Sequence, residues 1–158
     1  TILGSGRVAF ILNPADLLAS VERVDALSLA VVATPEAAPS TILVVEDSIT
    51  TRTLERSILE AAGYRVRVAK DGAEGWSVIQ SDGCDLVVSD IEMPVMDGIE
   101  LTARIRADDR YRHLPVVLVT SRDALADRER GLRAGADAYI VKGGFDQDRL
   151  LDTIRRFL

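Results

Sequence analysis

Cysteine, long apolar runs and basic clusters are nearly absent from this sequence. The single cysteine, Cys84, excludes a disulfide within the chain and fits a reducing compartment, so we expect a cytoplasmic protein. No apolar run approaches the roughly 18 residues that a membrane-spanning helix needs, and the first residues lack a signal-peptide pattern. The net charge is −6 without a basic cluster, so we expect neither membrane insertion nor nucleic-acid binding.

The sequence does contain enough apolar residues for one core. Hydrophobic residues make up 47% of the 158 residues and charged residues 28%, which predicts a folded chain rather than a disordered one. This length suits one domain with an appendage and is short for two independent domains. The chain starts at Thr1, and we expect it to be part of a longer protein.

The first 40 residues are organised differently from the rest. Residues 7–12 predict a strand, and Asn13 and Pro14 predict a helix start, because they suit the N-cap and the first helical position. One strand and one short helix cannot bury a core of their own. We therefore interpret residues 1–32 as the end of a preceding domain, and residues 33–40, rich in proline and alanine, as a linker.

From Thr41 onward, five short apolar runs alternate with five helical patterns. The predicted strands span residues 42–45, 64–69, 86–90, 115–120 and 138–142. The first four helices are predicted to start near Ser48, Asp71, Asp97 and residue 124, and the last to group Leu150, Leu151, Ile154, Phe157 and Leu158. The first helix is expected to bury Leu54, Ile58, Ala61 and Ala62 and to end at Gly63. Five strand–helix units predict an α/β fold: a doubly wound, five-stranded parallel sheet of order 2-1-3-4-5, with a short N-terminal strand–helix appendage.

Polar residues stand at the ends of four of these strands. Glu46 and Asp47 follow the first strand, Asp90 ends the third, Thr120 the fourth and Lys142 the fifth. Each alone has an ordinary interpretation as a helix cap, a strand former or a solvated strand tip. In a sheet of order 2-1-3-4-5, however, these ends lie side by side at the edge where ligands bind. Their occurrence together therefore predicts a shared site.

The residue types in that site predict phosphoryl chemistry. Three neighbouring carboxylates repel one another, and a hard cation with oxygen ligands, usually Mg²⁺, relieves the repulsion. A hydroxyl and an ammonium beside them add donors for a phosphoryl group. Because carboxylates can act as covalent phosphoryl acceptors, we predict that Asp90 is such an acceptor.

These residues lie in segments that resemble the receiver domain of two-component response regulators. The resemblance rests on Val45–Ser48, Ser89–Gly98, Val119–Ser121 and Tyr139–Lys142, and it extends over about residues 41–158. It implies a flavodoxin-like receiver fold and a place in a phosphorelay. Asp90 is then implied to accept a phosphoryl group from a phosphohistidine on a histidine kinase or on a histidine phosphotransfer domain.

The same resemblance implies a role for the neighbours of Asp90. The side chains of Asp47 and Asp90 are implied to hold Mg²⁺ together with the main-chain carbonyl of Glu92, while Glu46 acts mainly through water. Lys142 is implied to bind the phosphoryl oxygens.

A conformational switch is also implied. Thr120 is implied to turn toward the phosphoryl group and Tyr139 to move inward with it, because a phosphoryl group adds charge and strong hydrogen-bond acceptors. The helix at about 124–133, the fifth strand and the last helix would then present the face that a downstream protein reads.

Two departures from the family pattern concern this switch. Gly143 follows Lys142 where the family usually has proline, so a cis peptide bond before proline cannot hold this loop. Glu92 and Arg122 each lie two residues after a site residue, and we hypothesise that they pair over the phosphoryl group and slow its hydrolysis. An unchanged dephosphorylation rate in Glu92→Ala and Arg122→Ala would contradict this hypothesis.

A second resemblance concerns the N-terminus. Residues 4–14, with Leu17 and Leu18, are similar to the end of the coupling-protein-like domain of a chemotaxis histidine kinase of the CheA type. A receiver fused after that domain is a known hybrid arrangement, so the resemblance implies that the chain is the C-terminal receiver of such a kinase. An arbitrary strand–helix extension is the alternative.

Other functions are open at this point. A Mg²⁺-dependent aspartyl-phosphate hydrolase would need a second aspartate as general acid near Asp90, for which Glu92 is a poor substitute. A stand-alone phosphate-sink receiver and an unphosphorylated interaction domain are further alternatives, although the last usually lacks one of the site residues. We find no ATP site in the sequence, so the chemistry expected of this chain is self-catalysed phosphotransfer and dephosphorylation.

Overall fold

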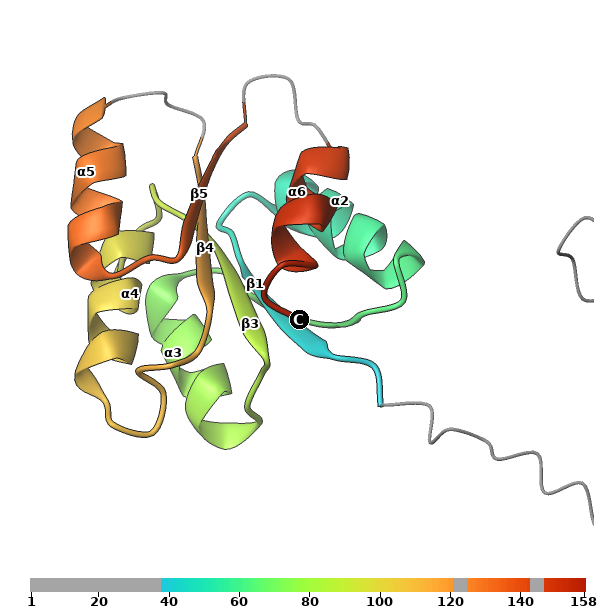
Figure 1. The fold of residues 1–158 in the computed structure, drawn as a ribbon, viewed down its shortest axis with the longest axis horizontal. Helices are drawn as coiled ribbons and strands as arrows, with labels where there is room; N and C mark the ends of the chain where they lie inside the picture. Colours follow the sequence, from blue (N-terminus) through green and yellow to red (C-terminus); the bar gives the residue numbers. More distant parts are fainter. Residues whose placement is uncertain (1–37, 121–124, 143–146) are drawn as a thin grey trace, which may run out of the picture. The chain divides into compact units, whose positions relative to one another are not determined.

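The computed structural model describes residues 38–120, 125–142 and 147–158, whose strands and helices alternate along the chain (Figure 1). The strands are β1 (Thr41–Val45), β2 (Arg65–Ala69), β3 (Leu86–Asp90), β4 (Val116–Thr120) and β5 (Ala138–Val141). The helices are α2 (Ile49–Ala61), α3 (Gly72–Ser81), α4 (Gly98–Ala107), α5 (Leu125–Ala134) and α6 (Gln147–Ile154). The predicted N-terminal appendage lies outside the described residues, so its interpretation as the end of another domain stays a prediction.

The five strands form one parallel sheet of order β2-β1-β3-β4-β5, which confirms the predicted fold. Neighbouring strands are in register near their carboxyl ends: Val45 pairs with Ser89, and Thr120 pairs with Val141. The residues that follow these pairs therefore emerge at the same edge of the sheet, which is where parallel α/β folds bind ligands.

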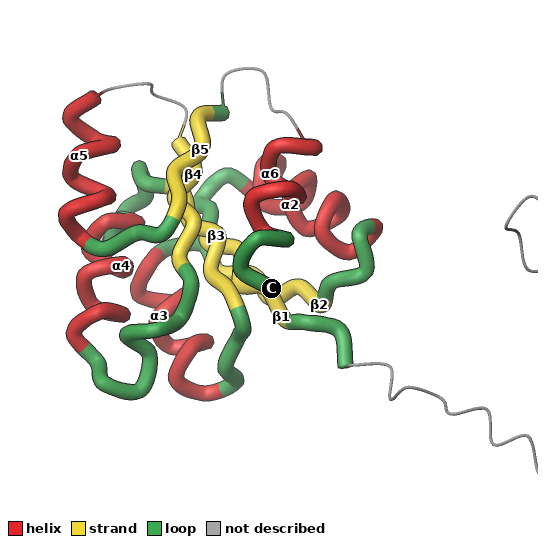
Figure 2. Tube along the Cα trace, in the orientation of Figure 1, coloured by secondary structure: helices red, strands yellow, loops and turns green. Residues whose placement is uncertain are grey.

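Helices cover both faces of this sheet. Helices α3, α4 and α5 lie on one side and α2 and α6 on the other, as Figures 1 and 2 show. Successive strand side chains point to opposite faces, so each strand contributes to two cores. In β1, Ile42 and Val44 belong to the core that contains α2 and α6, whereas Leu43 and Val45 belong to the core that contains α3 and α4.

The predicted buried face of α2 is wrong at three positions. Leu54 is 48% exposed, and Ala61 and Ala62 are also exposed, whereas Glu55, Ile58 and Leu59 are buried. The sheet contacts α2 along the line of these last three residues. Successive residues of a helix are about 100° apart around its axis, so a shift of one position turns Leu54 away from the core.

The end of the last helix also differs from its prediction. Helix α6 stops at Ile154, and the chain then turns, because the N–H groups of Phe157 and Leu158 both donate to the carbonyl of Ile154. Phe157 is 36% exposed and Leu158 44% exposed, so neither continues the buried face of Leu150, Leu151 and Ile154. Over the described residues, every helix is too short or too polar to cross a bilayer.

Candidate functional site

Three carboxylates meet at the carboxyl edge of the sheet, between β1 and β3. Glu46 and Asp47 directly follow β1, and Asp90 is the last residue of the adjacent β3. One oxygen of each carboxylate lies within 4.8 Å of the others. Glu46 is buried, Asp90 is half-buried and Asp47 is exposed. The structure thus brings together the three acidic residues that the sequence predicts, with one side of the group open to solvent.

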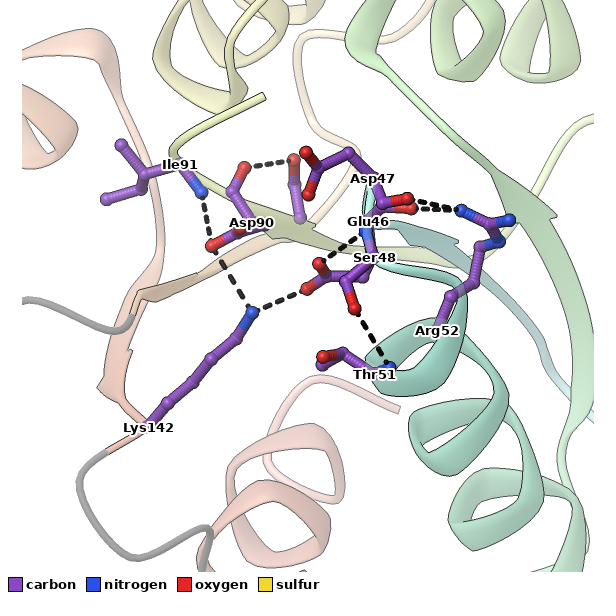
Figure 3. Close-up of polar contacts among 9 residues, drawn as sticks. Glu46, Asp47, Ser48, Thr51, Arg52, Asp90, Ile91 and Lys142 are labelled. Carbon is purple, nitrogen blue, oxygen red and sulfur yellow. Dashed lines mark hydrogen bonds and ion pairs between the residues drawn. The ribbon is translucent and has the colours of Figure 1, made fainter. Parts of the chain in front are cut away.

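Lys142, directly after β5, points its ammonium group into this acidic cluster (Figure 3). Its Nζ lies 2.5 Å from Oε2 of Glu46 and 3.4 Å from Oδ1 of Asp90. Its main-chain N–H donates to the carbonyl of Thr120 at 2.6 Å, which ties the residue after β5 to the end of β4. Burial lowers the pKa of Lys142, but the hydrogen bond that its ammonium donates to Glu46 and the charge of Asp90 outweigh this effect and raise that pKa. The ammonium therefore stays charged.

The carboxyl of Asp90 is held on one side by main chain. Its Oδ1 accepts a hydrogen bond from the N–H of Ile91 at 2.9 Å. Burial raises the pKa of Asp90 to about 6, although Lys142 opposes the shift, and the charge of Glu46 adds to it. The single positive charge of Lys142 does not balance the negative charges of the neighbouring carboxylates, so the site favours the binding of a further positive charge.

The oxygen atoms of the three carboxylates suit a hard divalent cation. The carboxylates of Glu46, Asp47 and Asp90 offer oxygen ligands only, which Mg²⁺ prefers. Asp47 and Glu92 also line one pocket of about 420 Å³ beside the cluster, together with Arg130 of α5. Glu92 is therefore placed near the predicted metal site, while the role of its carbonyl stays a prediction.

The two predicted switch residues lie on neighbouring strands. Thr120 ends β4 and is 1% exposed, and Tyr139 in β5 is half-buried. Tyr139 packs against the core that contains α3 and α4, and it also lines a groove of about 490 Å³ between β5 and α6. The predicted partner Arg122 and the loop residue Gly143 lie outside the described residues.

Asp97 has a structural role that separates it from Asp90. It caps α4: its side chain accepts from the N–H of Glu100, and the Glu100 carboxylate accepts from the N–H of Asp97. Gly98 then lies directly against the carbonyl of Asp90, at a point where a Cβ would overlap that oxygen. The start of α4 is therefore packed against the end of β3, and it fixes the backbone that presents Asp90.

Two residues of α2, Arg52 and Glu55, border the site although the sequence pattern does not predict them there. Glu55 is 2% exposed, and its Oε1 has no hydrogen-bond partner among the described residues. Burial raises the pKa of Glu55 to about 7, with Lys142 opposing and Glu46 adding to the shift. Arg52 donates to main-chain carbonyls beside the cluster. The sequence does contain one sign of the burial of Glu55: Ile58 and Leu59 follow it by three and four residues, a spacing that puts all three on one face of a helix.

Comparison with known proteins agrees with this geometry. The family model of the response regulator receiver domain matches residues 42–155. The gliding motility regulatory protein of Myxococcus xanthus is 35% identical over 154 residues, which are 98% of this chain but only 19% of that protein. The chain thus spans about a fifth of that relative's length.

Solved structures give the same result. The chemotaxis protein CheY4 of Vibrio cholerae matches with a TM-score of 0.72 and 34% identity, over 77% of this chain and 100% of that one. A second match is the receiver domain of the sensor histidine kinase PA1611 from Pseudomonas aeruginosa, which has a magnesium ion in its active-site cleft. It has a TM-score of 0.70 and 32% identity, over 76% of this chain and 98% of that one. The chain therefore belongs to the family of response regulator receiver domains.

Proposed function

We propose that Asp90 is the phosphoryl acceptor of this receiver domain. The observation that carries the proposal is the meeting of three carboxylates and one ammonium at adjacent strand ends, with Lys142 within 3.4 Å of Asp90. In this proposal an oxygen of Asp90 bonds to the phosphorus of a phosphohistidine while the bond from phosphorus to the imidazole nitrogen breaks. Since Oδ1 is engaged by Ile91 and faces Lys142, Oδ2 is the attacking oxygen.

Asp47 and Asp90, with Glu46 through water and the carbonyl of Glu92, would hold Mg²⁺. The ion supplies positive charge that offsets the charge on the phosphoryl oxygens. Glu46 also holds Lys142 in place through its 2.5 Å contact. When Asp90 carries a phosphoryl group, Lys142 gains an anionic partner in addition to the two carboxylates that it already contacts.

The output proposed for this domain is a change of the face formed by α5, β5 and α6. Thr120 ends the strand next to β5, and Tyr139 lies within β5 beside Leu118 of β4. A phosphoryl group on Asp90 offers the Thr120 hydroxyl a strong acceptor, and the movement of Thr120 leaves room for Tyr139. The groove beside Tyr139 is lined by Asp148, Arg149 and other charged residues, which suits a polar protein partner.

The phosphodonor in this proposal is a histidine kinase or histidine phosphotransfer domain, and the chain itself is the receiver of a chemotaxis-type hybrid kinase in the cytoplasm. Two findings support this context. The match to the much longer M. xanthus protein includes nearly all of this chain, and the P. aeruginosa structure is the receiver of a sensor histidine kinase. The sequence upstream of Thr1 tests it: a phosphotransfer domain and an ATP-binding domain there would support it, and their absence would contradict it.

Phosphorylation by a small phosphodonor tests the proposed acceptor. We expect the chain to incorporate about one phosphoryl group from labelled acetyl phosphate with Mg²⁺ and none with EDTA, because the carboxylates need the cation to accept the added charge. Asp90→Asn should reduce incorporation at least a hundredfold. Asp109→Asn, at a side chain that is 96% exposed, is the matched control and should leave it unchanged.

Two outcomes would contradict the proposal. Labelling of Asp90→Asn at the wild-type level would exclude Asp90 as the acceptor. Rapid and continuous release of phosphate from many phosphodonor molecules, without accumulation of phosphoprotein, would instead favour the hydrolase.

A further inference from the structure

Arg52 forms a bridge from α2 to the two residues that follow β1. Its Nη1 donates to the carbonyl of Glu46 at 2.5 Å and to that of Asp47 at 3.2 Å. In Figure 3 the guanidinium lies beside these two carbonyls, on the side of Asp47 opposite Asp90. A single group thus binds the main chain of two consecutive residues that carry site carboxylates.

The carboxylates of Glu46 and Asp47 are held to different extents. Glu46 is buried, its Oε1 accepts from the N–H of Ser48 at 3.0 Å, and its Oε2 contacts Lys142. Asp47 is exposed, and over the described part of the chain its carboxylate has neither a hydrogen bond nor an ion pair. The main chain on both sides of Asp47 is held instead: Arg52 binds the carbonyls of Glu46 and Asp47, and the N–H of Ser48 donates to Glu46. The orientation of Asp47 therefore depends on Arg52 more than that of Glu46 does.

The charge of Arg52 and its hydrogen bonds have opposite consequences for a cation. A positive charge next to an acidic cluster repels a divalent cation, so its removal alone would tighten binding. Hydrogen bonds that orient the groups around a metal ligand strengthen binding, and their loss typically weakens it 10–100-fold. The sign of the change in affinity thus separates the two roles.

We propose that Arg52 is a positioning residue that aims the carboxylate of Asp47 at the metal site. This proposal rests on the proposed function, because it requires that Asp47 holds Mg²⁺. Arginine is suited to this role, since its Nη1 carries two N–H donors, one for each carbonyl, and the group stays charged at every relevant pH. Lysine at this position would keep the charge, but its Nζ stands one bond closer to the main chain than Nη1, so it should not reach both carbonyls.

The test is calorimetric titration of the whole chain with Mg²⁺, without a phosphodonor. We expect Arg52→Lys and Arg52→Met each to raise the Kd for Mg²⁺ about tenfold. Arg56→Met is the matched control, because Arg56 lies on the same helix, is exposed and pairs with Glu60; it should change the Kd less than twofold. Urea unfolding in EDTA defines the folded fraction of each variant, so a loss of stability alone cannot account for the result.

Repeating the titration in a chain that also carries Asp47→Asn shows whether Arg52 affects Mg²⁺ binding through Asp47. If Arg52 acts through Asp47, Arg52→Lys should change the Kd less than twofold in that background, because coupled residues give non-additive effects. An unchanged or lower Kd in Arg52→Met, or the same tenfold loss with and without Asp47, would overturn the proposal. Failure of the wild-type chain to bind Mg²⁺ would instead reject the metal site of the proposed function.

Discussion

Replacing Gly98 with alanine is expected to lower the free energy of unfolding by about 3 kcal/mol or more, and to abolish phosphorylation by acetyl phosphate. A Cβ at this position would overlap the carbonyl oxygen of Asp90 and would lie 2.9 Å from Oγ of Ser89. The first of these groups is main chain, which cannot rotate away as a flexible side chain can. The N–H of Gly98 also donates to the carbonyl of Ile91 at 3.1 Å, so the helix start is tied to this strand end.

Gly83→Ala is the control for this substitution. Gly83 has a φ of +70° and open space where a Cβ would stand, so alanine there should cost only about 1–2 kcal/mol from the left-handed backbone. Chemical unfolding of both variants in EDTA measures the difference. A Gly98→Ala variant that is as stable as Gly83→Ala and still accepts a phosphoryl group would show that β3 and α4 are not packed in this way.

Replacing Glu55 with methionine is expected to stabilise the metal-free chain, and to do so more at pH 8 than at pH 5. Burial raises the folded-state pKa of Glu55 from 4.5 to about 7. The folded state therefore binds the proton more tightly than the unfolded state, and ionised Glu55 destabilises the fold. This penalty grows as the pH rises from 4.5 to about 7 and is then constant. The shift corresponds to a penalty on the order of 3 kcal/mol above that range.

Urea unfolding of wild type and Glu55→Met in EDTA at the two pH values measures this penalty. The stabilisation by methionine should be larger at pH 8 than at pH 5 by about 2–3 kcal/mol. Glu60→Met, on the exposed side of α2, should change the free energy of unfolding by no more than about 0.5 kcal/mol at both pH values. Equal stabilisation by Glu55→Met at pH 5 and pH 8 would mean that Glu55 does not titrate in the folded core.

The sheet and the edge that carries the site were predictable from the sequence because two periodicities alternate along the chain. Apolar runs mark the strands, and four of the five runs are followed by or end on a polar residue, so the order 2-1-3-4-5 places Asp90 between Glu46 and Thr120, with Lys142 one strand further along the same edge. The cap residue Asp97 was equally readable, since Glu100 follows it at the spacing of a capping box. The chemical roles of these residues stay predictions.

The residues of α2 were not predictable in the same way. Charged residues ordinarily lie on the solvent side of a helix, so the sequence predicts that Leu54 and not Glu55 lies in the core. Only the packed sheet shows which side of the helix is covered. The contact of Arg52 depends on the reach of a long side chain back to the strand end, and spacing alone does not encode that reach.

Direct localisation of the phosphoryl group tests the central claim. After reaction with acetyl phosphate and Mg²⁺, borohydride reduces an aspartyl phosphate to homoserine, and tandem mass spectrometry of the tryptic peptide 71–104 identifies the converted residue. That peptide contains Asp71, Asp82, Asp85, Asp90 and Asp97, so it includes four internal controls. We predict homoserine at position 90 and at none of the other four. Conversion at another aspartate with Asp90 intact would contradict the account.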